Sequence, residues 1–121
     1  MDELTTTGIS YVSELKDGEI NNFEINPEDL GLEKISISEI KGGDVRFNSK
    51  ALRDLLNNTG NKAYKDIVLL NSSAALLIAG KAEDLKQGIE IAREAIESSK
   101  AMQTLKSLIE VSNSVITVEE N

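Results

Sequence analysis

Two adjacent carboxylates near the start of the chain, Asp2 and Glu3, are the residues whose types and spacing could do chemistry. Threonine hydroxyls follow in the run Thr5-Thr6-Thr7, so the segment 1–8 is rich in oxygen donors. Mg²⁺ and Ca²⁺ prefer such ligands, and the pair could therefore bind a divalent cation. Two neighbouring acids at a chain end are also an everyday solvated pair. The spacing alone leaves both interpretations open, and a self-contained divalent-ion binder is one candidate function.

Composition excludes most other kinds of site. The 121 residues include no histidine and no cysteine, which removes Ser-His-Asp sets, cysteine nucleophiles, thiolate metal sites and disulfides. The formal net charge is −8 and aromatic residues make up 3% of the chain, which opposes binding of a phosphate backbone or of stacked bases. No lysine stands alone in an apolar run, as an activated amine would. We therefore expect no catalytic side chain, no substrate-binding side chain and no nucleic-acid partner.

The nearly uncharged run from Asp66 to Gly80 must carry the core. It is apolar on almost every side, which predicts a buried helix that begins near Lys62 and ends at Gly80. The run is too short, and too interrupted by the polar stretch 71–73, to span a bilayer. Because no apolar leader follows a basic start, the sequence predicts a cytoplasmic protein with no membrane partner.

The elements before this helix are predicted from turn signals. Residues 9–26 read as a β-hairpin around Asp17-Gly18, since both central residues of a type I′ turn need positive φ. Residues 27–47 form a connector, in which Asn26-Pro27 opens one helical turn and Ser38–Lys41 forms another. Gly42-Gly43 is interpreted as a bend, because a phosphate cradle needs more glycines and a strand-to-helix context.

Residues 48–113 read as helices. We expect Asn48 to cap a helix over Ser49–Asn57, followed by the central helix, a helix over Ala82–Ser98 and a last helix over Lys100–Ser112. The predicted apolar stripes are Leu85, Ile89, Ala92 and Ile96 in the third of these helices and Ala101, Leu105, Leu108 and Ile109 in the last. The tail 114–121 is β-prone and could add an edge strand or stay disordered. The predicted fold class is thus α+β, an N-terminal β-hairpin followed by about four helices, in a single domain piece over residues 1–121.

A series of short blocks occurs in a fixed order: Asp2-Glu3 with Gly8; Val12–Ile20; Pro27–Leu32; Gly42-Gly43-Asp44 with Asn48; Asp66–Asn71 with Ala74, Ala75 and Leu76; Ala79–Ala82; and Gly88-Ile89 with Ala92, Ala95 and Ile96. Together they resemble the C-terminal part of the α/β domain of anthranilate phosphoribosyltransferase, up to about Ile109. The pyrimidine nucleoside phosphorylases, which share the broad fold, are a weaker match. One position departs, because Ser99 stands where the family usually has glycine.

The resemblance implies a glycosyltransferase reaction of tryptophan biosynthesis. A ribose 5-phosphate unit moves from phosphoribosyl diphosphate to the amine of anthranilate, and diphosphate leaves. The family's adjacent Asp-Glu pair ligates Mg²⁺, and it is matched here by Asp2 and Glu3, so the resemblance implies a Mg²⁺ cofactor. The family's glycine-rich diphosphate loop, its anthranilate contacts and its N-terminal helical domain all precede that pair and have no counterpart in residues 1–121.

We therefore expect a C-terminal fragment of the transferase that is inactive alone, with phosphoribosyl diphosphate and anthranilate bound only by the full-length enzyme. The alternative is a stand-alone structural or interaction domain that reuses this part of the fold. In either case apolar surface that met the missing strands would lie open, and we expect a homo-oligomer.

Overall fold

The computed structural model describes residues 1 and 3–114. The tail that was predicted to form an edge strand or to be disordered lies outside the described residues, except for Ser114. The chain opens with an antiparallel hairpin of β1 (Ser10–Lys16) and β2 (Glu19–Ile25), in a register that runs from Ser10 opposite Ile25 to Lys16 opposite Glu19. Asp17 (φ 52°) and Gly18 (φ 82°) form its turn. Both have the positive φ that a type I′ turn requires, which confirms the predicted hairpin.

Two 3₁₀ turns connect the hairpin to the helices. η1 (Pro27–Leu30) begins where the Asn26 side chain accepts a hydrogen bond from the Glu28 N–H, at 3.3 Å. η2 (Ile37–Ile40) begins where the Glu39 side chain accepts a hydrogen bond from the Ser36 N–H, at 2.8 Å. Both predicted helical turns are therefore present, the second one residue earlier than expected.

The helix α1 (Val45–Leu56) starts four residues before the predicted Ser49, and the prediction of Asn48 as its N-cap is wrong. Asp44 caps the helix instead, because its Oδ1 accepts a hydrogen bond from the Phe47 N–H at 2.8 Å. The Asn48 amide lies in the first turn and binds Gly43 twice. Its Oδ1 accepts from the Gly43 N–H and its Nδ2 donates to the Gly43 carbonyl, both at 2.9 Å.

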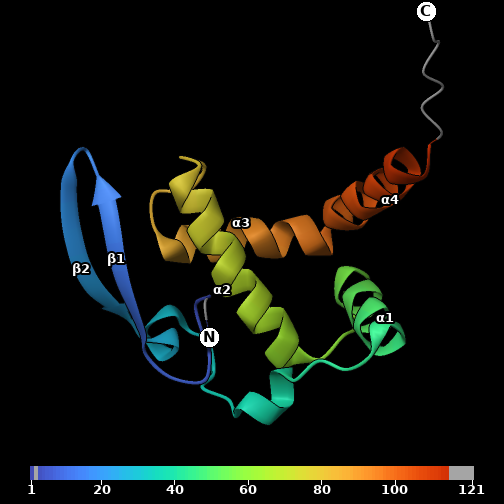
Figure 1. The fold of residues 1–121 in the computed structure, drawn as a ribbon, viewed down its shortest axis with the longest axis horizontal. Coiled ribbons are helices and arrows are strands. Elements are labelled where there is room, and N and C mark those ends of the chain that lie inside the picture. The colour runs from blue at the N-terminus through green and yellow to red at the C-terminus, as the bar shows by residue number, and fades with distance from the viewer. Residues whose placement is uncertain (2, 115–121) are drawn as a thin grey trace, which may run out of the picture.

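Three further helices follow in the described part of the chain: α2 (Lys62–Ile78), α3 (Leu85–Glu97) and α4 (Lys100–Asn113). Figure 1 shows the hairpin at one side of the molecule, α1 and α4 at the other, and α2 running obliquely between them. The strand pair followed by four α-helices confirms the predicted fold class for residues 3–114.

The core forms where α2 meets α3 and the hairpin end. Leu69 and Leu70 of α2 are fully buried, and the buried apolar cluster around them comprises Ile25, Leu32, Leu55, Ile89, Ala92 and Ile96. Gly88 of α3 lies directly against Ser73 of α2, so close that a Cβ atom at position 88 would stand 2.8 Å from the Ser73 Cα. The apolar stripe predicted for α3 is confirmed, because Ile89, Ala92 and Ile96 are buried.

The prediction that α2 is buried along its whole length is wrong for its last turn. Ile78 is 86% exposed, and apolar side chains of the hairpin such as Leu15 (73%) are exposed as well. An open hollow of ≈ 900 Å³ separates the hairpin from the end of α2. Ile78 and Leu15 line it, together with Val12, Phe23 and Leu77. In α4 the predicted core position Leu108 is also exposed. Among the residues described, no helix has the length and apolarity needed to cross a membrane.

Candidate functional site

The segment that follows the acidic pair is fixed by its own hydroxyl groups. The Thr5 N–H donates to Ser10 Oγ, and the Thr7 N–H donates to Thr5 Oγ1, each at 3.0 Å. The Thr6 carbonyl accepts from the Ile35 N–H at 3.1 Å, which joins the segment to the connector. Side-chain oxygens that bond nearby backbone N–H groups define a local conformation that is neither helix nor strand. The run of threonines therefore holds this loop in one shape.

The Asn71 side chain of α2 binds this segment across a separation of 67 residues. Its Oδ1 accepts a hydrogen bond from the Leu4 N–H at 3.0 Å, and its Nδ2 donates to the Leu4 carbonyl at 2.9 Å. Nδ2 also donates to the Ile67 carbonyl one turn earlier in α2, at 3.0 Å. The residue directly after Glu3 is thus attached to the central helix through both of its backbone polar groups.

Glu3 is exposed at the edge of a hollow whose lining is polar and apolar in similar measure, whereas Asp2, the other residue of the predicted pair, lies outside the described residues. The hollow has a volume of ≈ 720 Å³. It is lined by backbone and side chains of the first strand and of the preceding segment, together with two residues from elsewhere: Met1, Glu3, Leu4, Thr5, Thr7, Ile9, Ser10, Tyr11, Val12, Ser13, Ile37 and Asn71. Glu3 therefore faces solvent beside a hollow rich in hydroxyl groups.

The carboxylate of Glu3, next to Asp2 in sequence, suits a Mg²⁺ ion that keeps part of its water shell better than an ion that is fully enclosed by protein side chains. Within residues 1 and 3–114, no group of three or more acidic, histidine or cysteine side chains comes together. Mg²⁺ usually keeps several waters and is held by one or two carboxylates together with substrate phosphates. An exposed glutamate that adjoins an aspartate in sequence, beside an open hollow, fits that mode of binding.

The Thr6 hydroxyl is an exception to the well-bonded character of the segment. Thr6 is fully buried, and its Oγ1 has no hydrogen-bond partner in the part of the chain that the structure describes. A buried hydroxyl without a partner costs free energy relative to an apolar group of the same shape. Neither the composition nor the periodicity of the sequence indicated this.

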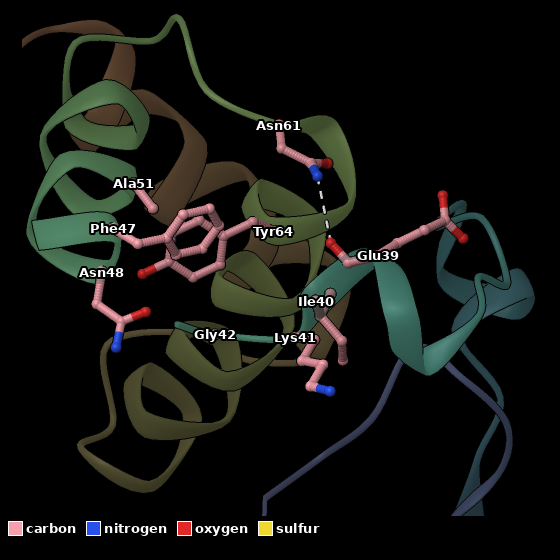
Figure 2. A pocket seen from close by; sticks show the side chains of 9 residues that line it. All are labelled: Glu39, Ile40, Lys41, Gly42, Phe47, Asn48, Ala51, Asn61 and Tyr64. Atoms are coloured by element: carbon pink, nitrogen blue, oxygen red, sulfur yellow. Dashed lines mark hydrogen bonds between the residues drawn. The ribbon is translucent and has the colours of Figure 1, made fainter. Parts of the chain in front are cut away.

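A second, smaller hollow lies where α1 faces α2 and the connector (Figure 2). Its volume is ≈ 160 Å³, and Phe47 and Tyr64 project into it. Asn61 Nδ2 donates to the Glu39 carbonyl at 3.2 Å on one side of it. Gly42 is at the other side, and the Gly43 N–H is already bonded to Asn48. The bend lies at Asp44, one residue after the predicted Gly42-Gly43, and position 43 offers no free N–H for a phosphate.

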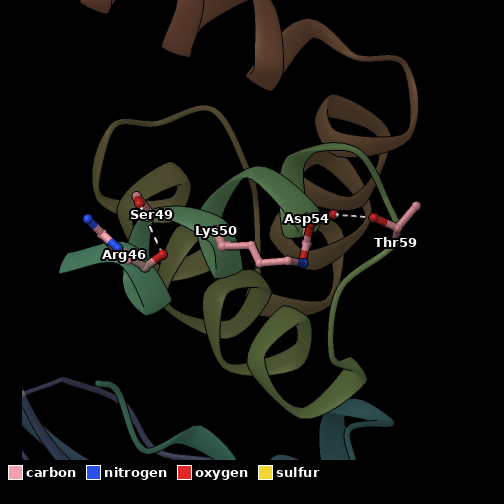
Figure 3. A network of polar contacts seen from close by, with 5 residues as sticks. All are labelled: Arg46, Ser49, Lys50, Asp54 and Thr59. Atoms are coloured by element: carbon pink, nitrogen blue, oxygen red, sulfur yellow. Dashed lines mark hydrogen bonds and ion pairs between the residues drawn. The ribbon is translucent and has the colours of Figure 1, made fainter. Parts of the chain in front are cut away.

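Ion pairs in the described residues lie mainly on the surface. The Lys62–Asp66 pair at the start of α2 joins an exposed lysine to a buried carboxylate, with Nζ and Oδ2 2.6 Å apart. The hydrogen bond to Asp66 raises the pKa of Lys62 above its ordinary value of 10.5, and the charges of Asp66 and Glu33 act in the same direction against partial desolvation. Figure 3 shows the other kind, in which Lys50 pairs with Asp54 on the exposed face of α1.

The exposed network of α1 also closes the end of that helix. The Thr59 N–H and hydroxyl both donate to the Asp54 carbonyl, at 2.9 and 3.1 Å. An exposed ion pair such as Lys50–Asp54 contributes about 0.3–0.5 kcal/mol within a helix. The network stabilises α1 and shows no geometry suited to a ligand.

Sequence reasoning did not identify Asn71 as a site residue. Asn71 appears there only as the last residue of the block Asp66–Asn71, with no role of its own. The available signal was an amide at the helical spacing of four residues from Ile67, in the middle of an apolar run. A polar side chain there must have a partner, but the sequence does not say which.

Comparison with known proteins identifies the family of the chain. Residues 1–102 match the model of the glycosyl transferase family, a/b domain. The chain is 53% identical over 113 residues to an anthranilate phosphoribosyltransferase of Parvibaculum lavamentivorans, and 48% identical over 113 residues to one of Chelativorans sp.. Each match covers 93% of this chain and 33% of the relative, so the chain spans about a third of the length of these relatives.

The fold agrees with a solved structure as well. The crystal structure of anthranilate phosphoribosyltransferase from Thermus thermophilus superimposes with a TM-score of 0.79 at 32% identity, and the match covers 88% of this chain and 31% of that one. The resemblance inferred from the ordered blocks is thereby confirmed. By sequence and by fold, the chain belongs to the glycosyl transferase family, within its a/b domain.

Proposed function

We propose that this chain acts as part of an anthranilate phosphoribosyltransferase. It contributes an acidic metal-binding segment, Asp2-Glu3-Leu4, and the helices that hold this segment. The observation that carries the proposal is the 53% identity to the Parvibaculum lavamentivorans relative over 93% of this chain. A stand-alone interaction domain is less favoured, because the similarity runs through nearly the whole chain in one order and includes the acidic pair. The reaction proposed for the whole protein is the one that the relative's name gives, a step of tryptophan biosynthesis.

The chemistry requires no protein nucleophile. Ribose 5-phosphate passes from phosphoribosyl diphosphate to the amine of anthranilate, with breakage of the bond to diphosphate and formation of a carbon–nitrogen bond. Asp2 and Glu3 are the proposed Mg²⁺ ligands, and an ion held there would supply positive charge to stabilise the diphosphate leaving group. Support comes from Glu3, whose carboxylate is exposed beside a hydroxyl-lined hollow and follows directly on Asp2. The task of this chain is then to present carboxylates from a fixed backbone.

The chain alone is expected to be inactive, because it spans about a third of its relatives. A chimera tests the proposal directly: this chain replaces the matched third of the Parvibaculum lavamentivorans enzyme. We expect the chimera to form phosphoribosylanthranilate, and the same chimera with Glu3→Gln to lose about tenfold or more in kcat/KM and to need more Mg²⁺. The purified chain without the remaining two thirds should give no product.

Two results would contradict the proposal. A folded chimera without activity, beside an active parent enzyme, would show that the chain lacks what the family requires. Turnover by the isolated chain with Mg²⁺ and both substrates would show that it needs no further segment. Unchanged Mg²⁺ dependence in the Glu3→Gln chimera would contradict the metal role only.

We further propose that the isolated chain is cytoplasmic and forms a homo-oligomer through its exposed apolar face. Support for self-association comes from Ile78 and Leu15, which are largely exposed at the hollow between α2 and the hairpin. Large exposed apolar patches are rarely left uncovered. Sedimentation velocity should show a dimer or larger species that dissociates in the Ile78→Glu variant. A wild-type chain that stays monomeric at high concentration would refute this.

A further inference from the structure

The Asn71 side chain is unusual in how completely it is used. An amide side chain offers two N–H donors and a carbonyl acceptor. Both Nδ2 donor positions of Asn71 are occupied, by the Leu4 and Ile67 carbonyls, and Oδ1 accepts from the Leu4 N–H. The pair of bonds to Leu4 fixes the orientation of that residue as well as its position, in the way that a neighbouring strand would.

The platform behind Asn71 is rigid. Leu69 and Leu70, which immediately precede it in α2, are fully buried in the core. The bond from Nδ2 to the Ile67 carbonyl fixes the side chain to its own helix. A group on a packed helix is held more accurately than one on a loop. The Leu4 backbone is consequently held at a fixed place relative to the centre of the fold.

Glu3 gains most from this arrangement. Consecutive Cα atoms are about 3.8 Å apart across a trans peptide, so fixing Leu4 on both sides of its Cα leaves the Glu3 backbone little freedom. Thr5 continues the restraint through its bond to Ser10 Oγ. The Glu3 side chain meanwhile stays exposed at the hollow. The backbone of this residue is held while its carboxylate is left free to bind.

We propose that Asn71 is a positioning residue for the metal-binding segment: its amide holds Leu4 so that the Glu3 carboxylate is presented from a fixed backbone. The inference rests on the proposed metal role of Glu3. A position inside an apolar run could have been filled by an apolar side chain, and a half-buried amide is favourable there only because each of its polar groups is bonded. Two of these bonds reach Leu4, next to Glu3, rather than a neighbouring helix, and this is why we assign Asn71 to the positioning of Glu3.

The test uses Mn²⁺ as a probe, with the free ion measured by electron paramagnetic resonance during titration of the chain. Asn71→Leu removes the amide and keeps the same number and branching of side-chain heavy atoms. Asn71→Ser is a second variant, since its short hydroxyl can bond a carbonyl of its own helix but cannot reach Leu4. Ile96→Val is the matched control, because it costs about 0.5–1.5 kcal/mol of stability in the core without changing a polar contact.

We expect both Asn71 variants to bind Mn²⁺ about tenfold or more weakly than wild type, the usual cost of losing support for a metal ligand, and Ile96→Val to bind it unchanged. Amide exchange at Leu4 should accelerate by about tenfold or more in the Asn71 variants, since one lost hydrogen bond is worth about 1 kcal/mol or more. This second readout reports the local contact and does not depend on the metal.

Each outcome decides something. Suppose that a folded Asn71→Ser chain exchanges its Leu4 amide faster than wild type but binds Mn²⁺ as tightly. That result would overturn the positioning role and leave the metal role of Glu3 intact. No Mn²⁺ binding by the wild-type chain up to roughly 10 mM with inorganic diphosphate present, or binding that Glu3→Gln leaves unchanged, would overturn the metal role and the inference together. Equal weakening in Ile96→Val would overturn the inference, because general loss of stability would then explain the effect.

Discussion

Replacement of Gly88 by alanine tests the packing on which the core depends. In an open helix this change normally stabilises, because alanine is favoured over glycine by about 0.5–1 kcal/mol. Here the added methyl group would stand 2.8 Å from both Cα and Cβ of Ser73, and 2.9 Å from its carbonyl oxygen. Carbon atoms in contact prefer separations of about 3.5–4.0 Å. The close approach of α3 to α2 must therefore be lost.

The magnitude follows from what can move. Two of the three obstructing atoms are main-chain atoms of a fully buried residue in α2, and they cannot rotate away. Overpacking of a core by one methyl group costs about 1–3 kcal/mol, and we take the upper part of that range for a main-chain obstruction. After subtraction of the helix preference, Gly88→Ala should lower the free energy of unfolding by about 2 kcal/mol, and Tm by roughly 5–10 °C.

Urea unfolding followed by circular dichroism measures this, with Gly8→Ala as the matched control. Gly8 has no positive φ, and a Cβ there would meet no atom within 4 Å among the described residues. Its change should stay within about 0.5 kcal/mol. The double variant Ser73→Gly with Gly88→Ala is informative too. It removes the Ser73 Cβ together with the hydroxyl that donates to the Leu70 carbonyl at 2.6 Å, and should not restore stability, since the Cα and carbonyl oxygen remain.

A Gly88→Ala variant that is as stable as wild type, or more stable, would refute the claim that a methyl group at position 88 obstructs the packing of α3 on α2. That result would mean that α2 and α3 separate at no cost, or that they do not approach closely at position 88. Full rescue by Ser73→Gly would instead place the obstruction on the side chain and contradict the main-chain explanation.

Three further changes have defined outcomes. Ser99, at φ 64°, occupies the left-handed region that favours glycine, so Ser99→Gly should raise the free energy of unfolding by about 0.5–1 kcal/mol in urea titrations, whereas a loss would refute the strain. Thr6→Val removes a buried hydroxyl with no described partner and should raise stability by about 1 kcal/mol by the same measurement; Thr6→Ser, which keeps the hydroxyl and loses the methyl, should lower it. The raised pKa of Lys62 means that its ion pair stabilises the fold below pH 10.5 and that this contribution is lost as pH rises through the folded-state pKa. The stability difference between wild type and Lys62→Met should therefore be constant between about pH 7 and pH 10 and shrink above it, and a difference that grows above pH 10 would contradict the sign.

Local signals were sufficient for the elements whose stability is local. The Asp17-Gly18 turn requires two positive φ angles, and few other sequences supply them, so the hairpin could be predicted with its register. The bounds of α2 followed from an apolar run that ends before Gly80. The stripe of Ile89, Ala92 and Ile96 in α3 followed from helical spacing. These features depend on residues that are close together in sequence.

Features that depend on distant partners could not be predicted in this way. Asn48 has the residue type of an N-cap, yet its amide bonds Gly43, and Asp44 caps α1 in its place. Ile78 lies in an apolar run but is exposed, because burial depends on whether another element covers that turn. The bond between Asn71 and Leu4 spans 67 residues and leaves no periodic trace in the sequence.

The same separation between local and distant contacts decides how core and site respond to change. Gly88→Ala displaces α3 from α2, but Asn71 is bonded to α2 itself and to Leu4, so the acidic segment is expected to move with α2. The variant should then lose stability while the chain that remains folded keeps its Mn²⁺ affinity. Asn71→Ser loses both bonds to Leu4, so it should lower stability by about 1–3 kcal/mol and, unlike Gly88→Ala, also weaken Mn²⁺ binding. Stability of the helical core and accuracy of the metal-binding segment are therefore controlled by different contacts on one helix, and the fold can tolerate change in the first without losing the second.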